Sequence, residues 1–213
     1  MKDVLKTTLV LAIIAIVSGG LLGAVYSFTK VDTSNASTSK LRQVYFAENY
    51  VAVDYRVGGE SISEPSETQI AGRVIKSYVA CNAEGEQQEG LLIFWAEGDK
   101  GYGGKVQILI CIENDVIKNI VSYSHSETPG LGGNALKDTH FDQYIGKNVI
   151  DTLFTVKTKS SITSADKNDP YCITAVTSAT YSSNSVNNAV NSAVSYYNRY
   201  KDKLLDATIS EVE

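Results

Sequence analysis

An uncharged apolar run near the amino terminus constrains the fold of this chain more than any other feature. Residues 7–29 read TTLVLAIIAIVSGGLLGAVYSFT and contain no charged side chain over 23 residues, with Lys6 before them and Lys30 after them. A helix of that length is about 34 Å long, which is enough to cross the hydrocarbon core of a bilayer. The sequence therefore predicts a transmembrane helix within residues 1–30.

The expected orientation of this helix follows from the charges that flank it. Lys2 and Lys6 lie on one side, and a similar number of basic residues follows on the other, so the positive-inside count is nearly balanced. A very short basic tail in front of a large acidic domain favours the tail inside the cell. We expect a single-pass protein with a cytoplasmic N-terminus and an extracytoplasmic main domain.

The composition argues against several classes of function. The 213 residues carry a net charge of −5, whereas nucleic-acid binding needs a basic face. The two histidines are distant in sequence, and the three cysteines show no CxxC spacing, so neither a zinc site nor a disulfide framework is indicated. We expect the thiols to be buried as small apolar groups, at Cys81, Cys111 and Cys172.

The rest of the chain divides by composition. Residues 31–40, VDTSNASTSK, are small and polar, and they are typical of a tether between a membrane helix and a domain. Apolar patterning begins near Leu41. We therefore expect a membrane anchor over 1–30, a tether over 31–40, one domain over 41–206 and a tail over 207–213.

Four segments are expected to be strands: 71–81, 90–98, 105–115 and 116–125. The last two form a clear hairpin, with alternating apolar residues in 105–115 and a turn at Asn114-Asp115. In 116–125 the pattern is looser, and we expect Ile117, Val121 and Tyr123 to share one face.

The last element is predicted to be a helix that follows Ser182-Ser183. Val186, Val190 and Ala193 recur at helical spacing, the asparagines between them fall off this apolar face, and serine is a good N-cap. Strands followed by a helix without regular alternation indicate an α+β domain with a mainly antiparallel sheet and packed helices.

Three stretches are candidates for function: GYGGK (101–105), HSETPGLGG (125–133) and TSAT (177–180). Each also has a simpler interpretation, since glycine-rich segments are commonly hairpin connections or surface loops. GYGGK lacks the spacing of a phosphate loop. His125 and Glu127 have no nucleophile within sequence reach, so a hydrolase is not supported.

Serine and threonine are concentrated in residues 173–185, ITAVTSATYSSNS, which contain seven of them and no charge. Thr180 stands immediately before the predicted helix, where free backbone N–H groups and the helix dipole favour a phosphate. The small residues Ser178 and Ala179 leave room for a phosphate ester. The alternative is that the cluster only caps the helix.

Taken together and in this order, behind one predicted membrane helix, the three stretches resemble the FMN-binding G subunit of the Rnf electron-transport complex. The C subunit of the sodium-pumping NADH:quinone reductase is similar and has the same layout. The resemblance extends over the anchor, the tether, residues 101–133 and the TSAT segment. The ETPGLG segment is its most specific part.

The resemblance implies that FMN is joined through its phosphate to Thr180. In the family a flavin transferase esterifies the threonine that closes an [S/T]-G-A-T sequence, and Thr177, Ser178 and Ala179 occupy the first three positions of that sequence here. Two positions depart from the family pattern. Ser178 replaces a glycine, which costs about 1 kcal/mol if that residue has a positive φ, and Thr174 stands where an aspartate is usual.

The resemblance also places the ETPGLG loop against the isoalloxazine ring of the flavin. It implies that Leu131 packs on the ring, that Thr128 and the amides of Gly130 and Gly132 bind its polar edge, and that Glu127 braces the loop without touching the flavin.

By this resemblance the chain is a redox subunit of a membrane-bound translocase that couples ferredoxin and NAD to ion transport. Its partners would be the other Rnf subunits, with FMN or iron–sulfur clusters, and the flavin transferase, in the plasma membrane of a prokaryote. The chain itself contains no Rossmann fingerprint and no cluster-type cysteine spacing. The equivalent subunit of the quinone reductase and a cofactor-free, membrane-anchored structural protein are the alternatives.

Overall fold

The computed structural model describes residues 2–29, 36–53, 56–57, 60–61 and 71–205. Residues 31–35, which are half of the expected tether, and the expected tail, 207–213, lie outside the described residues. The chain divides into two units, residues 1–35 and residues 36–213, and each is described by itself. Residues 38–40, which the sequence assigns to the tether, are the first turn of a helix in the second unit.

Helix α1 (Lys2–Thr29) makes up the described part of the first unit. Among the described residues, we find no helix that is both long enough and apolar enough to span a membrane, so the membrane span predicted for residues 1–30 is not confirmed. Large apolar side chains are nevertheless exposed along α1, at Val4, Leu9, Val10, Leu11, Ile14, Ile16, Val17, Leu21 and Leu22.

The second unit is built on a five-stranded antiparallel sheet with the order β1-β4-β5-β6-β7. Its strands are β1 (Asn49–Ala52), β4 (Gly72–Cys81), β5 (Leu91–Gly98), β6 (Val106–Glu113) and β7 (Val116–Ser124). The four strands expected from the sequence are β4 to β7. The prediction of a mainly antiparallel sheet in an α+β domain is confirmed.

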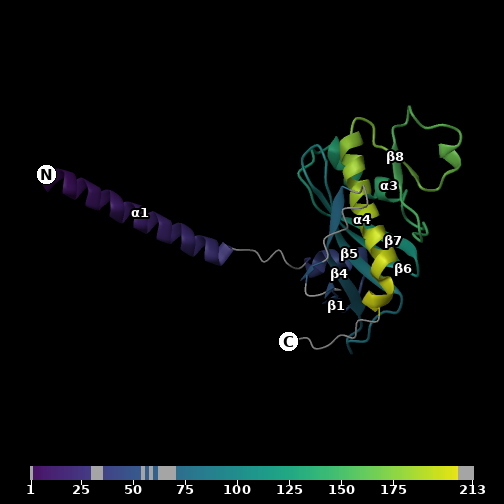
Figure 1. Ribbon diagram of the computed structural model, residues 1–213, viewed down its shortest axis with the longest axis horizontal. Coiled ribbons are helices and arrows are strands. Elements are labelled where there is room, and N and C mark those ends of the chain that lie inside the picture. Colours follow the sequence, from purple (N-terminus) through teal and green to yellow (C-terminus); the bar gives the residue numbers. More distant parts are fainter. Residues whose placement is uncertain (1, 30–35, 54–55, 58–59, 62–70, 206–213) are drawn as a thin grey trace. The chain divides into compact units, whose positions relative to one another are not determined.

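Helices cover both faces of this sheet. The long helix α4 (Thr180–Leu205) packs across β4, β5 and β6 on one face, as Figure 1 shows, and the larger apolar cluster lies between them. Helix α2 (Thr38–Val44) contacts β6 and β7 and contributes to a second cluster on the opposite face. Every side chain of β5 is therefore buried, which explains its continuous apolar sequence.

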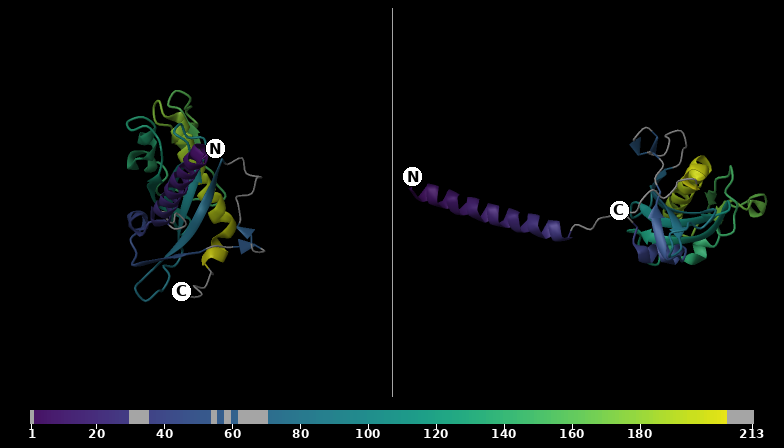
Figure 2. Two further views of the ribbon diagram at one scale, coloured as in Figure 1. Left: turned by 90° about the vertical axis from the view of Figure 1, so that its left-hand side faces the viewer. Right: turned by 90° about the horizontal axis from the view of Figure 1, so that it is seen from below.

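Shorter elements complete the domain (Figure 2). The strands β2 (Arg56–Val57) and β3 (Glu60–Ser61) pair with each other, and β8 (Thr155–Lys157) pairs in parallel with β9 (Cys172–Thr174). The remaining helical turns are η1 (Gly132–Leu136), α3 (Asp138–Phe141) and η2 (Asp166–Asn168).

The turn of the β6–β7 hairpin is confirmed at the predicted residues. Asn114 and Asp115 both have positive φ, at 49° and 66°. A two-residue hairpin turn of type I′ requires this conformation at both positions, and asparagine and aspartate tolerate it well. The alternating apolar residues of 105–115 lie on one face of β6, in the cluster beneath α4, at Val106, Ile108, Ile110 and Ile112.

The prediction for the faces of β7 is wrong. Ile117 and Ile120 lie in the cluster beneath α4, whereas Val121 and Tyr123 pack against the cluster on the opposite face. The pairing register with β6 skips Lys118, so one extra residue is accommodated there. Because such a bulge reverses the alternation, residues on its two sides exchange faces.

Helix α4 begins before Ser182-Ser183, the pair after which the sequence predicts its start. Thr180 is its first residue, and Ser182 and Ser183 lie inside its first turn, so the predicted serine caps are wrong. Both serine side chains are buried and have other partners. Ser182 Oγ donates to Glu127, and Ser183 Oγ accepts a hydrogen bond from the backbone of Val176.

Two asparagines of α4 are buried, although the sequence pattern places them off the apolar face. The side-chain amides of Asn187 and Asn191 both donate to the carbonyl of Phe154, at 3.0 and 2.9 Å, and Asn191 also accepts from the Phe154 N–H. These bonds satisfy the backbone just before β8 and fix that segment to the helix.

The expectation for the cysteines holds for two of the three. Cys81 and Cys111 are buried, and burial raises the pKa of the Cys111 thiol to about 12. Cys172 is half-buried at the start of β9.

His140 is expected to make the stability of the domain depend on pH. Its side chain is buried, Nε2 has no partner among the described residues, and burial lowers its pKa to about 4. The unfolded chain takes up this proton near pH 6.5, so the free energy of unfolding should fall by about 3 kcal/mol as the pH drops from 6.5 to 4. Urea unfolding at several pH values should show this decline, and His140→Phe should remove most of it. An unchanged decline in His140→Phe would contradict the assignment.

Candidate functional site

GYGGK, ETPGLG and the first turn of α4, which follows TSAT, meet at one buried carboxylate, that of Glu127. Its Oε1 accepts a hydrogen bond from the backbone N–H of Gly103 at 3.0 Å, and its Oε2 accepts from Ser182 Oγ at 2.7 Å. Gly103 belongs to GYGGK, Glu127 begins ETPGLG, and Ser182 follows TSAT in α4. Glu127 therefore connects the three segments, and its predicted bracing role agrees with these contacts.

The GYGGK segment, here called the glycine turn (101–105), packs tightly against the other two. A Cβ atom at Gly101 would overlap the Glu127 carboxylate, and one at Gly103 would overlap the backbone carbonyl of Ser126. Lys105, the cation of this turn, binds Glu97 at 2.7 Å and lies 3.5 Å from Asp99. The glycine turn therefore has a packing role, and its lysine is already paired.

The ETPGLG loop (127–132) contains a tight turn. The N–H of Leu131 donates to the carbonyl of Thr128 at 3.2 Å, and Gly130 has φ +78°, which matches a type II turn with proline at its second position. Neither the Gly130 nor the Gly132 N–H has an acceptor among the described residues. Leu131 is 54% exposed.

The TSAT segment, here called the flavin turn (177–180), leads into α4. Thr177 and Ser178 are exposed, Ala179 is buried, and Thr180 is half-buried as the first helical residue. Within the described structure, the N–H groups of Thr180 and the next two residues have no acceptor. Free amides at the start of a 26-residue helix form a natural anion site.

Ser178 has a positive φ of 62°. The left-handed conformation is strained for serine and free for glycine, which agrees with the glycine that the resemblance places at this position. Ser178→Gly should therefore raise the free energy of unfolding by about 0.5–1 kcal/mol, as measured by urea unfolding. Thr177→Gly is the matched control, because Thr177 has no positive φ and should gain nothing. Equal effects of the two substitutions would argue against strain at Ser178.

A pocket of about 470 Å³ opens beside the flavin turn. One wall consists of residues 158–160, and the other consists of residues 175–178 with Thr180. Thr174 faces a neighbouring pocket of about 760 Å³, which shares only Lys159 with the first. The position where the family has an aspartate therefore lies outside the pocket that contains Thr180.

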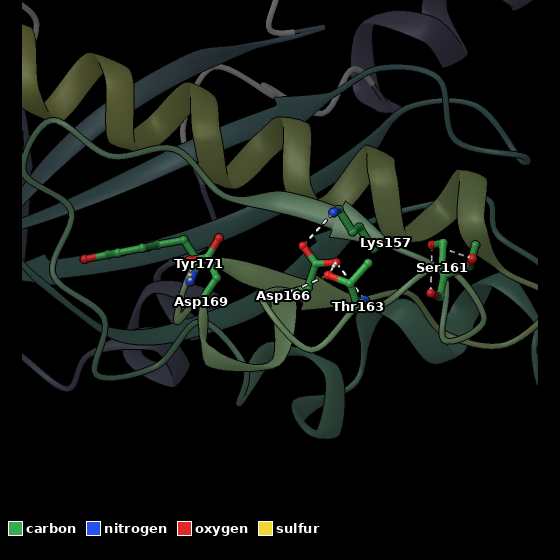
Figure 3. Close-up of polar contacts among 7 residues, drawn as sticks. Lys157, Ser161, Thr163, Asp166, Asp169 and Tyr171 are labelled. Carbon is green, nitrogen blue, oxygen red and sulfur yellow. Dashed lines mark hydrogen bonds and ion pairs between the residues drawn. The ribbon is translucent and has the colours of Figure 1, made fainter.

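The wall formed by 158–160 was not predicted from the sequence. It belongs to the β8–β9 loop (158–171), whose polar contacts are drawn in Figure 3. Asp166 organises this loop, since it accepts hydrogen bonds from Lys157 Nζ at 2.6 Å and from the Thr163 backbone and hydroxyl at 2.8 and 2.7 Å. These hydrogen bonds, with that from Lys157 the strongest, lower the pKa of Asp166 to about 2.

The remaining candidate, His125, contacts this arrangement through the backbone of Glu127. His125 is exposed just beyond β7, and its Nδ1 accepts from the Glu127 N–H at 3.2 Å. No group of three or more histidine, cysteine or acidic side chains that could hold a metal ion occurs within the described ranges.

The residues around the flavin turn fit an FMN molecule. The free amides at the start of α4 and the adjacent pocket suit a phosphate, and Thr180 offers a half-buried hydroxyl between them. The exposed Leu131 and the free amides of Gly130 and Gly132 suit a flat, apolar ring with a polar edge, although Gly132 itself is buried beside Glu127 and Ser182. Glu127 links the ETPGLG loop to α4 through Ser182, two residues after Thr180, although none of the described residues of that loop lines the pocket.

Comparisons with known proteins confirm the resemblance. Residues 101–195 match the family model of the FMN-binding domain. The G subunit of the proton-translocating ferredoxin:NAD(+) oxidoreductase complex of Clostridium ljungdahlii is 41% identical over 88 residues, which are 41% of this chain and 43% of that protein. The C subunit of the Na(+)-translocating NADH-quinone reductase of Yersinia pestis is 28% identical over 115 residues, 53% of this chain and 42% of that protein. The match thus spans less than half the length of either relative.

Two crystal structures are also similar to the chain. Shewanella oneidensis NqrC has a TM-score of 0.49 and 18% identity, over 68% of this chain and 70% of that one. The C subunit of the Na(+)-translocating NADH-quinone reductase of Parabacteroides distasonis has a TM-score of 0.49 and 21% identity, over 82% of this chain and 86% of that one. At these identities, the assignment of function depends on the sequence matches.

Proposed function

Because residues 101–195 carry an FMN-binding domain, we propose that this chain is the electron-relay subunit of an Rnf-type complex and holds FMN through a phosphoester at Thr180. The observation that carries the proposal is the position of Thr180. Its hydroxyl stands at the first residue of α4, beside three free amides and an open pocket. In this setting a phosphate has donors on one side and a threonine oxygen on the other.

The residues of the flavin turn have distinct parts in this proposal. Thr180 provides the esterified oxygen. Ser178 lets the chain reverse direction through its positive φ, and Ala179 packs inward at 5% exposure, which directs the helix start toward the pocket. Thr177 lines the pocket with a hydroxyl. No carboxylate from the flavin turn competes with the phosphate.

The ETPGLG loop would hold the ring. Leu131 covers one face of it, while the amides of Gly130 and Gly132 donate to its polar edge and Thr128 contributes its hydroxyl. These amides favour negative charge on the ring, so they raise its reduction potential. FMN itself supplies the electron-transfer chemistry, and the chain controls its position and its potential.

The choice of complex follows the more similar relative. The G subunit of the ferredoxin:NAD(+) oxidoreductase complex has 41% identity, compared with 28% for the C subunit of the quinone reductase. We therefore place the chain in a translocase of the first kind, with other membrane subunits that carry FMN or iron–sulfur clusters as partners. A flavin transferase would attach the cofactor. The quinone reductase remains the second candidate because its C subunit also matches.

Attachment to the plasma membrane of a prokaryote through residues 1–30 is part of the proposal. Its support is the 23-residue uncharged run and the apolar side chains exposed along α1, from Val4 to Leu22. The main domain would then lie outside the cytoplasm. A cofactor-free structural protein is disfavoured because it gives no reason for the free amides and exposed leucine of the ETPGLG loop.

The test is flavin fluorescence in a denaturing gel, after expression of the whole chain with and without its flavin transferase. The proposal predicts a fluorescent band that depends on the transferase, because only a covalent flavin survives denaturation. If the band of this chain is not fluorescent although the same transferase labels another substrate, the result contradicts covalent attachment. The chain would then bind FMN noncovalently or not at all.

A further inference from the structure

The pocket beside Thr180 has a second wall that the family resemblance does not assign. Residues 158–160 of the β8–β9 loop face the flavin turn across it. Lys159 is the one charged residue among the described side chains that line this pocket. Its position on an exposed turn leaves the ammonium group free to reach into the opening.

The turn that carries Lys159 is ordered by its own hydroxyl groups. Thr158 Oγ1 lies 3.2 Å from Ser160 Oγ and 2.9 Å from Ser161 Oγ, and Ser161 Oγ also donates to the Thr158 carbonyl at 2.9 Å. Immediately before it, Lys157 is bound to Asp166. The backbone on both sides of Lys159 is therefore fixed by hydrogen bonds, and this fixes the position of the Lys159 Cα atom.

Lys159 differs from the other cations near the site. Lys105 and Lys157 each bind a carboxylate, whereas no carboxylate lies within ion-pair distance of Lys159 among the described residues. Lys147 and Lys167 line the neighbouring pocket only. Lys159 is thus the available positive charge for an anion at Thr180.

We propose that Lys159 binds the phosphate of FMN from the side opposite the helix start, so that the β8–β9 loop and the flavin turn close on the phosphate together. This inference rests on the proposed function and extends it to a phosphate-binding residue. The helix amides supply neutral donors, and Lys159 supplies the only full charge in the pocket among the described residues. A hydrogen bond with an ionised donor and acceptor is stronger than a neutral one.

The experiment compares FMN with riboflavin, which lacks the phosphate, on the whole chain made without transferase. The ratio of their dissociation constants, measured by calorimetry, reports the contribution of the phosphate alone. We expect the wild type to bind FMN about tenfold more tightly than riboflavin, and Lys159→Gln to reduce this preference to about two- to threefold. Riboflavin affinity should stay the same in Lys159→Gln.

Lys167→Gln is the matched control, because it removes the same charge from the same loop but from the neighbouring pocket. It should retain the wild-type preference for FMN. An equal loss in both variants, an unchanged preference in Lys159→Gln, or a wild type without any preference would overturn the proposal. A wild-type chain that binds neither FMN nor riboflavin also shows no preference and would overturn the proposal.

The two proposals fail in different ways. A wild type that takes no covalent flavin from its transferase, but prefers FMN in a manner dependent on Lys159, would refute the ester at Thr180 and leave the phosphate site in place. A covalent flavin on wild type and on Lys159→Gln, without any preference for FMN over riboflavin, would refute the role of Lys159 alone.

Discussion

Thr180→Val is expected to abolish covalent flavin attachment completely. Valine has nearly the shape of threonine but lacks the oxygen that the proposed ester requires. Thr180 is half-buried and its side chain makes no hydrogen bond among the described residues, so the fold should tolerate the change. Intact-mass analysis after expression with transferase should show the unmodified mass alone for this variant, with FMN less one water added to the wild type.

Two controls make this result specific. Thr180→Ser keeps the hydroxyl and should still accept flavin. Thr177→Ser changes a neighbouring residue of the same pocket, keeps a residue that the family sequence allows at its first position, and should leave attachment intact. A flavin retained by Thr180→Val would show that another hydroxyl of residues 173–185 carries the ester.

Glu127→Ala is expected to lower the free energy of unfolding by about 2–4 kcal/mol. The carboxylate is 4% exposed and binds both Gly103 and Ser182, so its removal leaves a backbone N–H and a hydroxyl without their acceptor. It also leaves a void between the glycine turn, the ETPGLG loop and α4. Urea unfolding of the chain without FMN measures this loss directly.

Glu127→Gln is the informative comparison. Its amide carbonyl can accept from Gly103 while its amino group donates to Ser182 Oγ, since a serine hydroxyl both donates and accepts. The variant should lose about 1 kcal/mol or less. If Glu127→Ala unfolds at the same urea concentration as the wild type, Glu127 does not hold the three segments together.

Local patterns were sufficient for much of the fold. The hairpin at Asn114-Asp115 was predictable because two adjacent residues fix the turn. The C-terminal helix was predictable because its apolar spacing is regular over about three turns. The bulge at Lys118 was not, since an inserted residue in a strand leaves the composition unchanged and is set by pairing with β6.

The candidate site was predicted in part. ETPGLG and TSAT were singled out from the sequence, and in the fold Glu127 of the first binds Ser182, which lies two residues after the second. The bracing bonds themselves could not be predicted, because Gly103 and Ser182 are distant in sequence from Glu127 and only the fold brings them together. Buried Asn187 and Asn191 were missed for the same reason: their partner, the backbone of Phe154, is invisible in a hydrophobic pattern.

The β8–β9 loop was missed although its sequence contains one signal. Residues 158–163, TKSSIT, repeat the hydroxyl-rich character of the flavin turn and add a lysine. Serine and threonine are common in ordinary loops, so this signal is weak without the geometry. Only the parallel pairing of β8 with β9 brings the two segments to one pocket.

Peptide mapping by mass spectrometry of the wild-type chain, purified after expression with its flavin transferase, tests the central claim most directly. The account predicts a single flavin-bearing peptide, with the modification located on Thr180. A flavin on any other residue would contradict it. An unmodified chain, purified after expression with a transferase that is proven active, would also contradict it.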